Sequence, residues 1–288
     1  RKGQWAGPGF WGSQRMGLKA HLPEMLRNIC ADGSKQFFAA LLALLFTGHI
    51  SSCGGKDRSF GGEETVLKLP HMSLPLRIYK PEKRCRAFVL FASGDGGWKA
   101  FEDKVCRYLA SQGFCVIGWD CRKFADPGQY DQELLVAGFA AALDEAMRIT
   151  KVRDVPVVFS GYSTGAEQAL AAAAAIPRQP QLVGLLVIAP GERGRYGITM
   201  ADLMGIKPVG DGSFGLSDLA QGVEGLRVVQ IHGEHDPLDS TEWLGHLDTP
   251  HQLKIYPDGW HFFKDGPPDF LKLLADAIDW ILDPVGNC

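Results

Sequence analysis

The sequence of 288 residues lacks several features that mark particular classes of protein. Its 30 basic and 33 acidic side chains give a formal net charge of -3, so it has no excess of basic residues of the kind that binds nucleic acid. It also lacks the runs of like charge that are typical of disordered tails. We therefore expect no nucleic-acid partner. Hydrophobic residues make up 45% of the chain, which is enough for a packed core.

Signals for metals and for cofactors are missing as well. The seven cysteines form no Cys-x-x-Cys pair and the histidines are scattered, so the sequence predicts neither a metal site nor a cofactor. The glycine-rich stretch "FASGDGGW" at residues 91–98 has neither a Gly-Lys-Ser/Thr ending nor Gly-x-Gly-x-x-Gly spacing. Those two patterns are typical of loops that hold nucleotide phosphates, so we discount a phosphate loop here.

An apolar block, "FFAALLALLF" at residues 37–46, is too short to cross a bilayer. It follows Lys35 and fits the hydrophobic region of a signal peptide. Soon after it comes Ile50-Ser51-Ser52-Cys53, which resembles the bacterial lipobox, where cleavage leaves a lipidated cysteine at the new N-terminus. The alternative is a buried helix with a chance cysteine.

These features divide the chain into three parts. We exclude residues 1–52 from fold reasoning as upstream residues plus a signal peptide that would begin at Met25. A flexible tether is expected at 53–63 and a single domain at 64–288. A lipid on Cys53 would hold the protein on a membrane surface of the bacterial cell envelope, facing the periplasm.

Export would permit disulfides, but the spacing of the cysteines indicates none. Cys30 and Cys53 belong to the leader and the lipobox, and the five that remain are an odd number. Cys106 and Cys115 lie in apolar patterns, where a buried free thiol is the common outcome. No pairing follows from the sequence.

Apolar runs that alternate with helix-like segments predict the fold class. Two alternating segments, 64–69 and 74–79, indicate a hairpin. Continuous apolar runs, which suit buried parallel strands, follow at 87–92, 114–119, 155–160, 182–189, 226–233 and 251–257. Helix-like segments lie at 99–112, 132–150, 166–175 and 268–282. The pattern predicts one α/β domain with a mainly parallel sheet that helices cover on both faces.

A serine lies in a glycine-flanked turn between a predicted strand and a predicted helix. Gly161-Tyr162-Ser163-Thr164-Gly165 matches Gly-x-Ser-x-Gly, which is a weak signal alone. The strand before it and the helix after it are the context of a nucleophile elbow, in which small flanking residues let the serine oxygen stand clear of the backbone. The alternative is an ordinary turn with a serine cap. We predict that Ser163 is a nucleophile.

A base and its orienting acid are expected in the chain order Ser, Asp, His. Asp236 follows one predicted strand and His261 follows the next, so both reach the sheet edge where Ser163 lies. His261 would act as general base and Asp236 would orient it. Asp239 is the alternative acid, and His235 or His251 the alternative base.

An oxyanion hole needs two backbone N–H groups near the nucleophile. One would come from Thr164, the residue after the serine. The other would come from Asp95 or Gly96 in the loop "SGDGGW", which follows an earlier predicted strand.

These stretches resemble a known family. "SGDGGW" after a strand, "GYSTGA" at the elbow and the closing "DGWHFFKDG" look like the VirJ/AcvB group of bacterial virulence proteins. The resemblance implies an α/β-hydrolase fold, export to the periplasm, and hydrolysis of an aminoacyl ester of phosphatidylglycerol, lysyl-phosphatidylglycerol above all. It covers nearly the whole predicted domain.

Such a substrate would place a cationic amino acid near the nucleophile, and a carboxylate could bind it. Candidates near predicted strand ends are Asp95, Asp120, Asp126 and Glu167. The alternatives are that Glu167 favours the helix dipole and that the aspartates cap turns. Trp98 and Tyr162 are further candidates for substrate contact.

We therefore expect an exported serine hydrolase that cleaves the ester of an aminoacylated phospholipid. One alternative is a general carboxylesterase or a dienelactone-hydrolase-like enzyme that acts on soluble esters. Another is a non-catalytic accessory protein that binds an envelope or secretion-system partner. The glycine-rich stretch 190–225 lies between two predicted strands and is either a lid that faces the substrate or a plain surface excursion.

Overall fold

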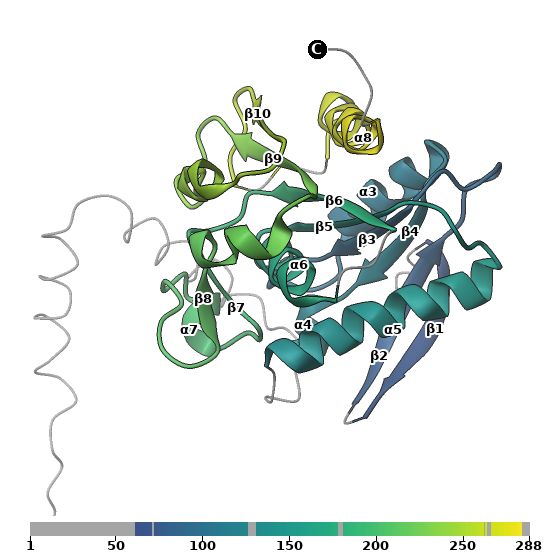
Figure 1. The fold of residues 1–288 in the computed structure, drawn as a ribbon, viewed down its shortest axis with the longest axis horizontal. Helices are drawn as coiled ribbons and strands as arrows, with labels where there is room; N and C mark the ends of the chain where they lie inside the picture. The colour runs from purple at the N-terminus through teal and green to yellow at the C-terminus, as the bar shows by residue number, and fades with distance from the viewer. Residues whose placement is uncertain are drawn as a thin grey trace, which may run out of the picture. The chain divides into compact units, whose positions relative to one another are not determined.

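An eight-stranded sheet forms the centre of the part of the chain that the structure describes. The computed structural model describes residues 61–70, 72–125, 131–177, 181–261, 263 and 266–283, all within one compact unit, Ser51–Cys288 (Figure 1). The expected signal peptide, Cys53 and Asp126 lie outside the described residues. No helix in the described ranges is long and apolar enough to span a membrane.

The sheet is parallel except at one end. Its order is β1-β2-β4-β3-β5-β6-β9-β10. β1 (Glu63–Leu69) and β2 (Met72–Tyr79) form the predicted hairpin, and β2 pairs antiparallel with β4. The parallel strands are β3 (Phe88–Ala92), β4 (Cys115–Trp119), β5 (Val157–Tyr162), β6 (Leu182–Ile188), β9 (Arg227–Gly233) and β10 (His251–Tyr256). Each predicted apolar run therefore overlaps a strand, and β5 continues two residues beyond the run predicted at 155–160.

Helices cover both faces of the sheet, as Figure 1 shows. α3 (Ala100–Ser111) and α8 (Pro268–Leu282) pack on one face, and α5 (Gln132–Thr150) and α6 (Thr164–Ala175) pack on the other. Successive side chains of a strand enter opposite cores, so Phe88 and Leu90 join the core beneath α5 and α6, while Val89 joins the other. Because both of their faces are buried, the central strands β3, β4 and β6 consist of apolar residues and glycine.

The chain between β6 and β9 forms a small unit of its own. β7 (Arg193–Arg195) pairs antiparallel with β8 (Ser213–Gly215), and α7 (Met200–Leu203) lies between them in the chain. The sequence indicated no strands here, so this ribbon is a difference from expectation. We call residues 190–216 the excursion. The short helices α4 (Cys121–Ala125), η1 (Ser217–Val223) and η2 (Glu242–His246) complete the described elements.

The cysteines within the described ranges are thiols. Cys85, Cys106, Cys115 and Cys121 are buried and free. The expectation of buried free thiols at Cys106 and Cys115 is confirmed.

Two glycines allow α6 to lie directly on the backbone of the sheet. A Cβ at Gly165 would overlap the carbonyl oxygens of Ala92 and Ser93 at the end of β3. A Cβ at Gly161 would overlap the backbone of Gly165 itself. The backbones approach so closely that no side chain fits between them, which fixes the beginning of α6 against the carboxyl ends of β3 and β5.

We predict that Gly165→Ala destabilises the protein, although alanine is the better helix former in isolation. The added methyl group must displace the carbonyl groups of β3, which should lower the free energy of unfolding by about 2 kcal/mol or more. Urea unfolding followed by circular dichroism measures it. Gly245→Ala is the matched control, because nothing lies within 4 Å of a Cβ there. Equal unfolding midpoints for the two variants would contradict the prediction.

Candidate active site

Ser163 lies in a sharp turn between β5 and α6. Its backbone has φ 52° and ψ -125°, a left-handed conformation that a residue other than glycine rarely adopts. The turn is held from both sides, because Ser163 N–H donates to Ile188 O on the neighbouring strand at 2.9 Å, and Ala166 N–H donates to Ser163 O at 2.8 Å. This is the strained strand-to-helix turn of a nucleophile elbow.

The imidazole of His261 lies between a serine and a carboxylate. His261 Nε2 is 3.1 Å from Ser163 Oγ, and His261 Nδ1 is 2.8 Å from Asp236 Oδ2. The other oxygen of Asp236 accepts hydrogen bonds from the N–H groups of Leu238, at 2.8 Å, and Asp239, at 3.2 Å. The Asp236 side chain is fully buried and that of His261 is only 12% exposed. A carboxylate held in this way keeps the proton on Nδ1, so the lone pair of Nε2 can accept the proton of the serine.

The other predicted acid and bases lie elsewhere. Asp239 contacts His232 and not His261, with Oδ2 2.7 Å from His232 Nδ1. His235 is exposed, and its Nε2 lies 3.5 Å from Asp258 Oδ1. His251 Nδ1 lies 3.0 Å from Thr249 O on the edge strand β10. The structure thus brings together Ser163, His261 and Asp236, and none of the alternatives.

The predicted oxyanion loop lies beside the nucleophile. Gly97 N–H donates to Gly94 O at 3.0 Å, which closes a turn with Asp95 and Gly96 at its centre. Gly94 rests on the ring of Tyr162, where a Cβ would lie 3.2 Å from Cδ1. The amides of Thr164, Asp95 and Gly96 donate to none of the described residues. They are therefore available to an oxyanion, and their role there stays a prediction.

Trp98 and Tyr162, predicted to contact substrate, both lie largely buried. Tyr162 O–H donates to the carbonyl oxygen of His261 at 2.8 Å, and its ring packs beside the imidazole with centroids 5.5 Å apart. Trp98 packs inward against Gly118 and stacks near Tyr79, with centroids 6.4 Å apart. The tie between Tyr162 and His261 gives Tyr162 a supporting role that the sequence did not indicate. Substrate contact by either residue stays a prediction.

Comparison with known proteins identifies the family. The family model of the bacterial virulence protein VirJ matches residues 86–280, well over half of the chain. The chain belongs to the VirJ family. A search of curated protein sequences gave no significant match.

Solved structures of similar fold are esterases and lipases. A soluble variant of monoglyceride lipase from Saccharomyces cerevisiae is 15% identical with a TM-score of 0.57, over 79% of this chain and 97% of that one. Dienelactone hydrolase from Anabaena variabilis is 21% identical with a TM-score of 0.56, over 76% and 95%. A carboxyl esterase from Bacillus coagulans is 14% identical with a TM-score of 0.59, over 76% and 98%. At these identities the likeness shows the fold alone, and this VirJ family member has the α/β-hydrolase fold that was expected.

Glu167 is a buried carboxyl group one helical turn after the nucleophile. Its Oε1 accepts a hydrogen bond from Gly191 N–H at 3.0 Å, at the start of the excursion. Burial raises the pKa of Glu167 to about 8, and the Asp95 and Asp202 carboxylates add to the rise, while the bond from Gly191 opposes it. Glu167 therefore holds its proton over much of the neutral range. Binding of a cationic substrate by this residue stays a prediction.

The other carboxylates predicted to bind a cationic substrate are Asp120, Asp95 and Asp126. Asp120 is buried and its Oδ1 accepts a hydrogen bond from Lys123 N–H at 3.1 Å, at the start of α4. This is the turn-capping alternative considered for it. Asp95 lies at the centre of the turn that Gly94 and Gly97 close in the predicted oxyanion loop. Asp126 lies outside the described residues.

A second histidine-carboxyl pair supports the loop that carries Asp236. Asp239 contacts His232 with one oxygen and accepts a hydrogen bond from Gln230 Nε2 at 2.8 Å with the other. Gln230 in turn accepts a hydrogen bond from Trp243 Nε1 at 2.7 Å. Burial and the nearby Asp236 carboxylate raise the pKa of Asp239 to about 9, so at neutral pH it adds no negative charge beside Asp236. Sequence reasoning missed this network because its members are polar residues on or after an apolar strand.

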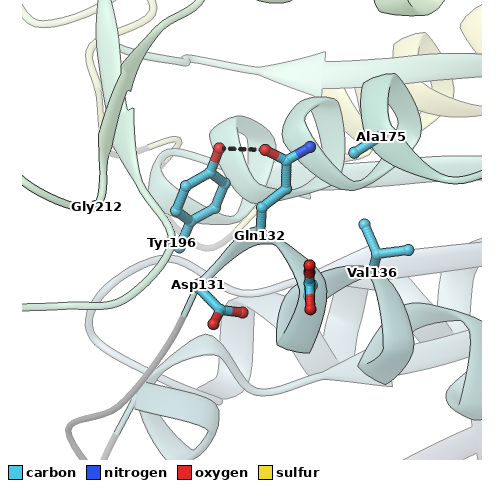
Figure 2. A pocket seen from close by; sticks show the side chains of 7 residues that line it. Asp131, Gln132, Val136, Ala175, Tyr196 and Gly212 are labelled. Carbon is cyan, nitrogen blue, oxygen red and sulfur yellow. Dashed lines mark hydrogen bonds between the residues drawn. The ribbon is translucent and has the colours of Figure 1, made fainter.

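A hollow of about 620 Å³ lies where the excursion meets the helices, away from the three aligned side chains. Figure 2 shows Tyr196 O–H donating to Gln132 Oε1, at 3.0 Å, across its wall. Its lining residues are Asp131, Gln132, Glu133, Val136, Ala175, Tyr196 and Gly212. Ser163 and His261 do not line it. The hollow therefore lies at the contact between the excursion and α5, and we assign no function to it.

One group of surface side chains has the composition of a metal site. The ligand atoms of Glu234, His235 and Asp258 lie within 4.8 Å of one another, and all three residues are exposed. Asp258 N–H donates to Glu234 at 3.0 Å, so the group also joins the two loops that hold Asp236 and His261. Exposed charged groups often meet in this way without a metal.

We predict that the pH dependence of stability reports the burial of Glu167. The unfolded chain loses this proton near the ordinary glutamate value of 4.5, whereas the folded protein holds it to about 8. The unfolded state therefore binds fewer protons between these values, and the free energy of unfolding falls as pH rises through them, by up to about 5 kcal/mol from this group. Glu167→Gln keeps an acceptor for Gly191 and cannot ionise, so its stability should fall less.

Chemical unfolding at about pH 5 and about pH 9 measures the difference. Between these two pH values, the free energy of unfolding of Glu167→Gln should rise by about 4 kcal/mol relative to that of the parent protein. Glu82→Gln, at an exposed glutamate, is the control and should follow the parent. Parallel pH curves for Glu167→Gln and the parent would show that Glu167 is ionised in the folded protein.

Proposed function

We propose that this VirJ family member is a serine hydrolase of carboxylic esters, with Ser163 as nucleophile, His261 as general base and Asp236 as its orienting acid. The observation that carries the proposal is the chain of contacts from Asp236 through His261 to Ser163 Oγ, at 2.8 and 3.1 Å, with the serine at φ 52°. The fold, which esterases and lipases share, supports it.

The first half of the reaction transfers the acyl group to the enzyme. His261 Nε2 accepts the proton of Ser163 Oγ while that oxygen attacks the ester carbonyl carbon, and a tetrahedral oxyanion forms. The N–H of Thr164, with that of Asp95 or Gly96, donates to this oxyanion; each such donor contributes on the order of 3 kcal/mol. Collapse breaks the carbon-oxygen bond to the alcohol, which leaves with the proton from His261.

The second half releases the acid. Water gives a proton to His261 Nε2 and attacks the acyl carbon, so a second oxyanion forms in the same place. Its collapse breaks the bond to Ser163 Oγ, which regains the proton, and the carboxylic acid leaves. In both halves, Asp236 accepts a hydrogen bond from His261 Nδ1–H and stabilises the positive charge on the imidazole.

For the substrate we propose the aminoacyl ester of an aminoacylated phosphatidylglycerol such as lysyl-phosphatidylglycerol. The support is the family, to which the motifs "SGDGGW" and "GYSTGA" already pointed. In this proposal the protein faces the periplasm at a bacterial membrane, held by a lipid on Cys53. A second candidate is an esterase of soluble substrates, favoured by the fold that the chain shares with dienelactone hydrolase.

We predict that Ser163→Ala abolishes turnover, because it removes the oxygen that attacks the ester. A loss of roughly 10⁴-fold or more is expected. A lipid extract is treated with the purified variant, and the loss of aminoacyl phosphatidylglycerol is followed by mass spectrometry. Ser217→Ala, at an exposed serine of η1, is the matched control and should keep full activity.

Three results would redirect the proposal. Undiminished turnover by Ser163→Ala would exclude the serine mechanism. Parent activity on short soluble esters alone, with none on the aminoacyl lipid, would favour the second candidate. An intact cellular phenotype in cells that carry Ser163→Ala would favour the accessory protein, which binds an envelope partner without catalysis.

A further inference from the structure

Large apolar side chains that are exposed gather at one edge of the sheet. Among the described residues nine such side chains are exposed, and six of them lie on the segments that follow the carboxyl ends of β6, β9 and β10. These six are Met200, Met204, Ile206, Val209, Leu238 and Trp260, which we call the apolar rim. The other three, Val66, Leu253 and Ile255, lie on the edge strands β1 and β10.

The apolar rim lies at the same edge as the aligned side chains. Leu238 is two residues after Asp236, and its N–H donates to that carboxylate at 2.8 Å. Trp260, 51% exposed, directly precedes His261. The excursion follows β6, the strand that pairs with the end of β5 where Ser163 lies. Three segments therefore present apolar side chains at the edge of the sheet where Ser163 lies.

Charged groups among these side chains are mostly neutralised within the excursion. Lys207 pairs with Glu192 at 2.5 Å, and Arg195 pairs with Asp202 at 3.2 Å. Arg193 Nε donates to the carbonyl oxygen of Pro208 at 2.9 Å. Paired charges cost less to bring near hydrocarbon than single ones do. These two ion pairs reduce the charge that the tip of the excursion would bring into an apolar environment.

We propose that the apolar rim docks on the surface of a lipid bilayer and turns Ser163 toward it. Four of the six side chains come from the excursion and two from the loops after β9 and β10. Side chains spread over three segments suit a fluid surface that needs no matching shape, and Trp260 is of the type that favours the membrane interface. This inference rests on the proposed function, because a lipid substrate is what gives the docking a purpose. A bilayer seated here delivers the headgroup ester to Ser163 while the acyl chains stay in the membrane.

The competing orientation presents the opposite edge of the sheet. There, between β2 and the end of α3, a hollow of about 850 Å³ is lined in part by Lys80, Lys83, Arg84, Arg86 and Arg107. Such a surface would attract anionic headgroups by charge and would release them at high salt. Docking by the apolar rim is instead insensitive to salt, so the salt dependence of binding distinguishes the two orientations.

The test measures partition of the full chain onto vesicles of phosphatidylethanolamine and phosphatidylglycerol by co-sedimentation. The protein carries Cys53→Ser, so that no lipid anchor contributes, and Ser163→Ala, so that no lipid is consumed. Replacing Met200, Met204 and Val209, the most exposed members of the apolar rim, by Ser should weaken partition at least tenfold. The matched control replaces Val66, Leu253 and Ile255 by Ser and should change it less than twofold.

Unchanged partition of the rim variant, or equal loss in the control, overturns the inference. Loss caused by Lys83→Glu with Arg84→Glu, together with release at high salt, would instead place the bilayer at the basic hollow. A rim variant that changes the oligomeric state in gel filtration would assign these side chains to a second copy of the chain. With Ser163 intact, the rim variant should cleave a soluble ester at the parent rate. A parent that cleaves no ester contradicts the proposed function, whereas loss of this cleavage in the rim variant alone contradicts a role of the rim in docking only.

Discussion

The close approach of α6 to the ends of β3 and β5 is the constraint on which the site depends. Gly161 and Gly165 leave no room for a side chain, so the helix begins directly against the sheet. The chain can make this reversal only if Ser163 takes φ 52°, and that turn lifts its oxygen out of the sheet edge. The strain is repaid by the bonds from Ser163 N–H to Ile188 and from α6 back to Ser163 O. The position of the nucleophile is therefore set by packing of the backbone.

The remaining members of the site are held by the parallel sheet and by buried polar bonds. β9 and β10 end beside each other, so the loops that carry Asp236 and His261 leave the same edge. Two backbone N–H groups fix the Asp236 carboxylate, and Tyr162 fixes the backbone of His261. Near them, burial keeps Glu167 and Asp239 protonated, so neither adds a negative charge beside Asp236 at neutral pH.

Much of this arrangement could be predicted from the sequence because it is encoded locally. Apolar runs mark buried strands, and the glycines around Ser163 mark the elbow. Since parallel strands end at one edge, the position of Asp236 and His261 after two strands implied their meeting with Ser163. The bond from Tyr162 to His261 O joins segments that are distant in the chain, which no local pattern shows. The pairing of Asp239 with His232 depends on how the loop after β9 folds back on that strand, which the sequence does not show either. The β7–β8 ribbon was missed because its strands are short and rich in glycine and arginine.

The excursion combines a fixed base with an apolar tip, and this bears on whether it is a lid or a plain surface segment. At its base, Gly191 N–H donates to Glu167, and Gln168 Nε2 donates to Tyr196 O at 3.0 Å, so both bonds join it to α6. Gly194 lies so close to Glu167 that a Cβ would crowd it. A lid that swings away would have to break these buried bonds together. Because α6 also carries Ser163 at its beginning, the base moves with the nucleophile. We therefore interpret the excursion as a platform that keeps its apolar tip in a constant position relative to Ser163.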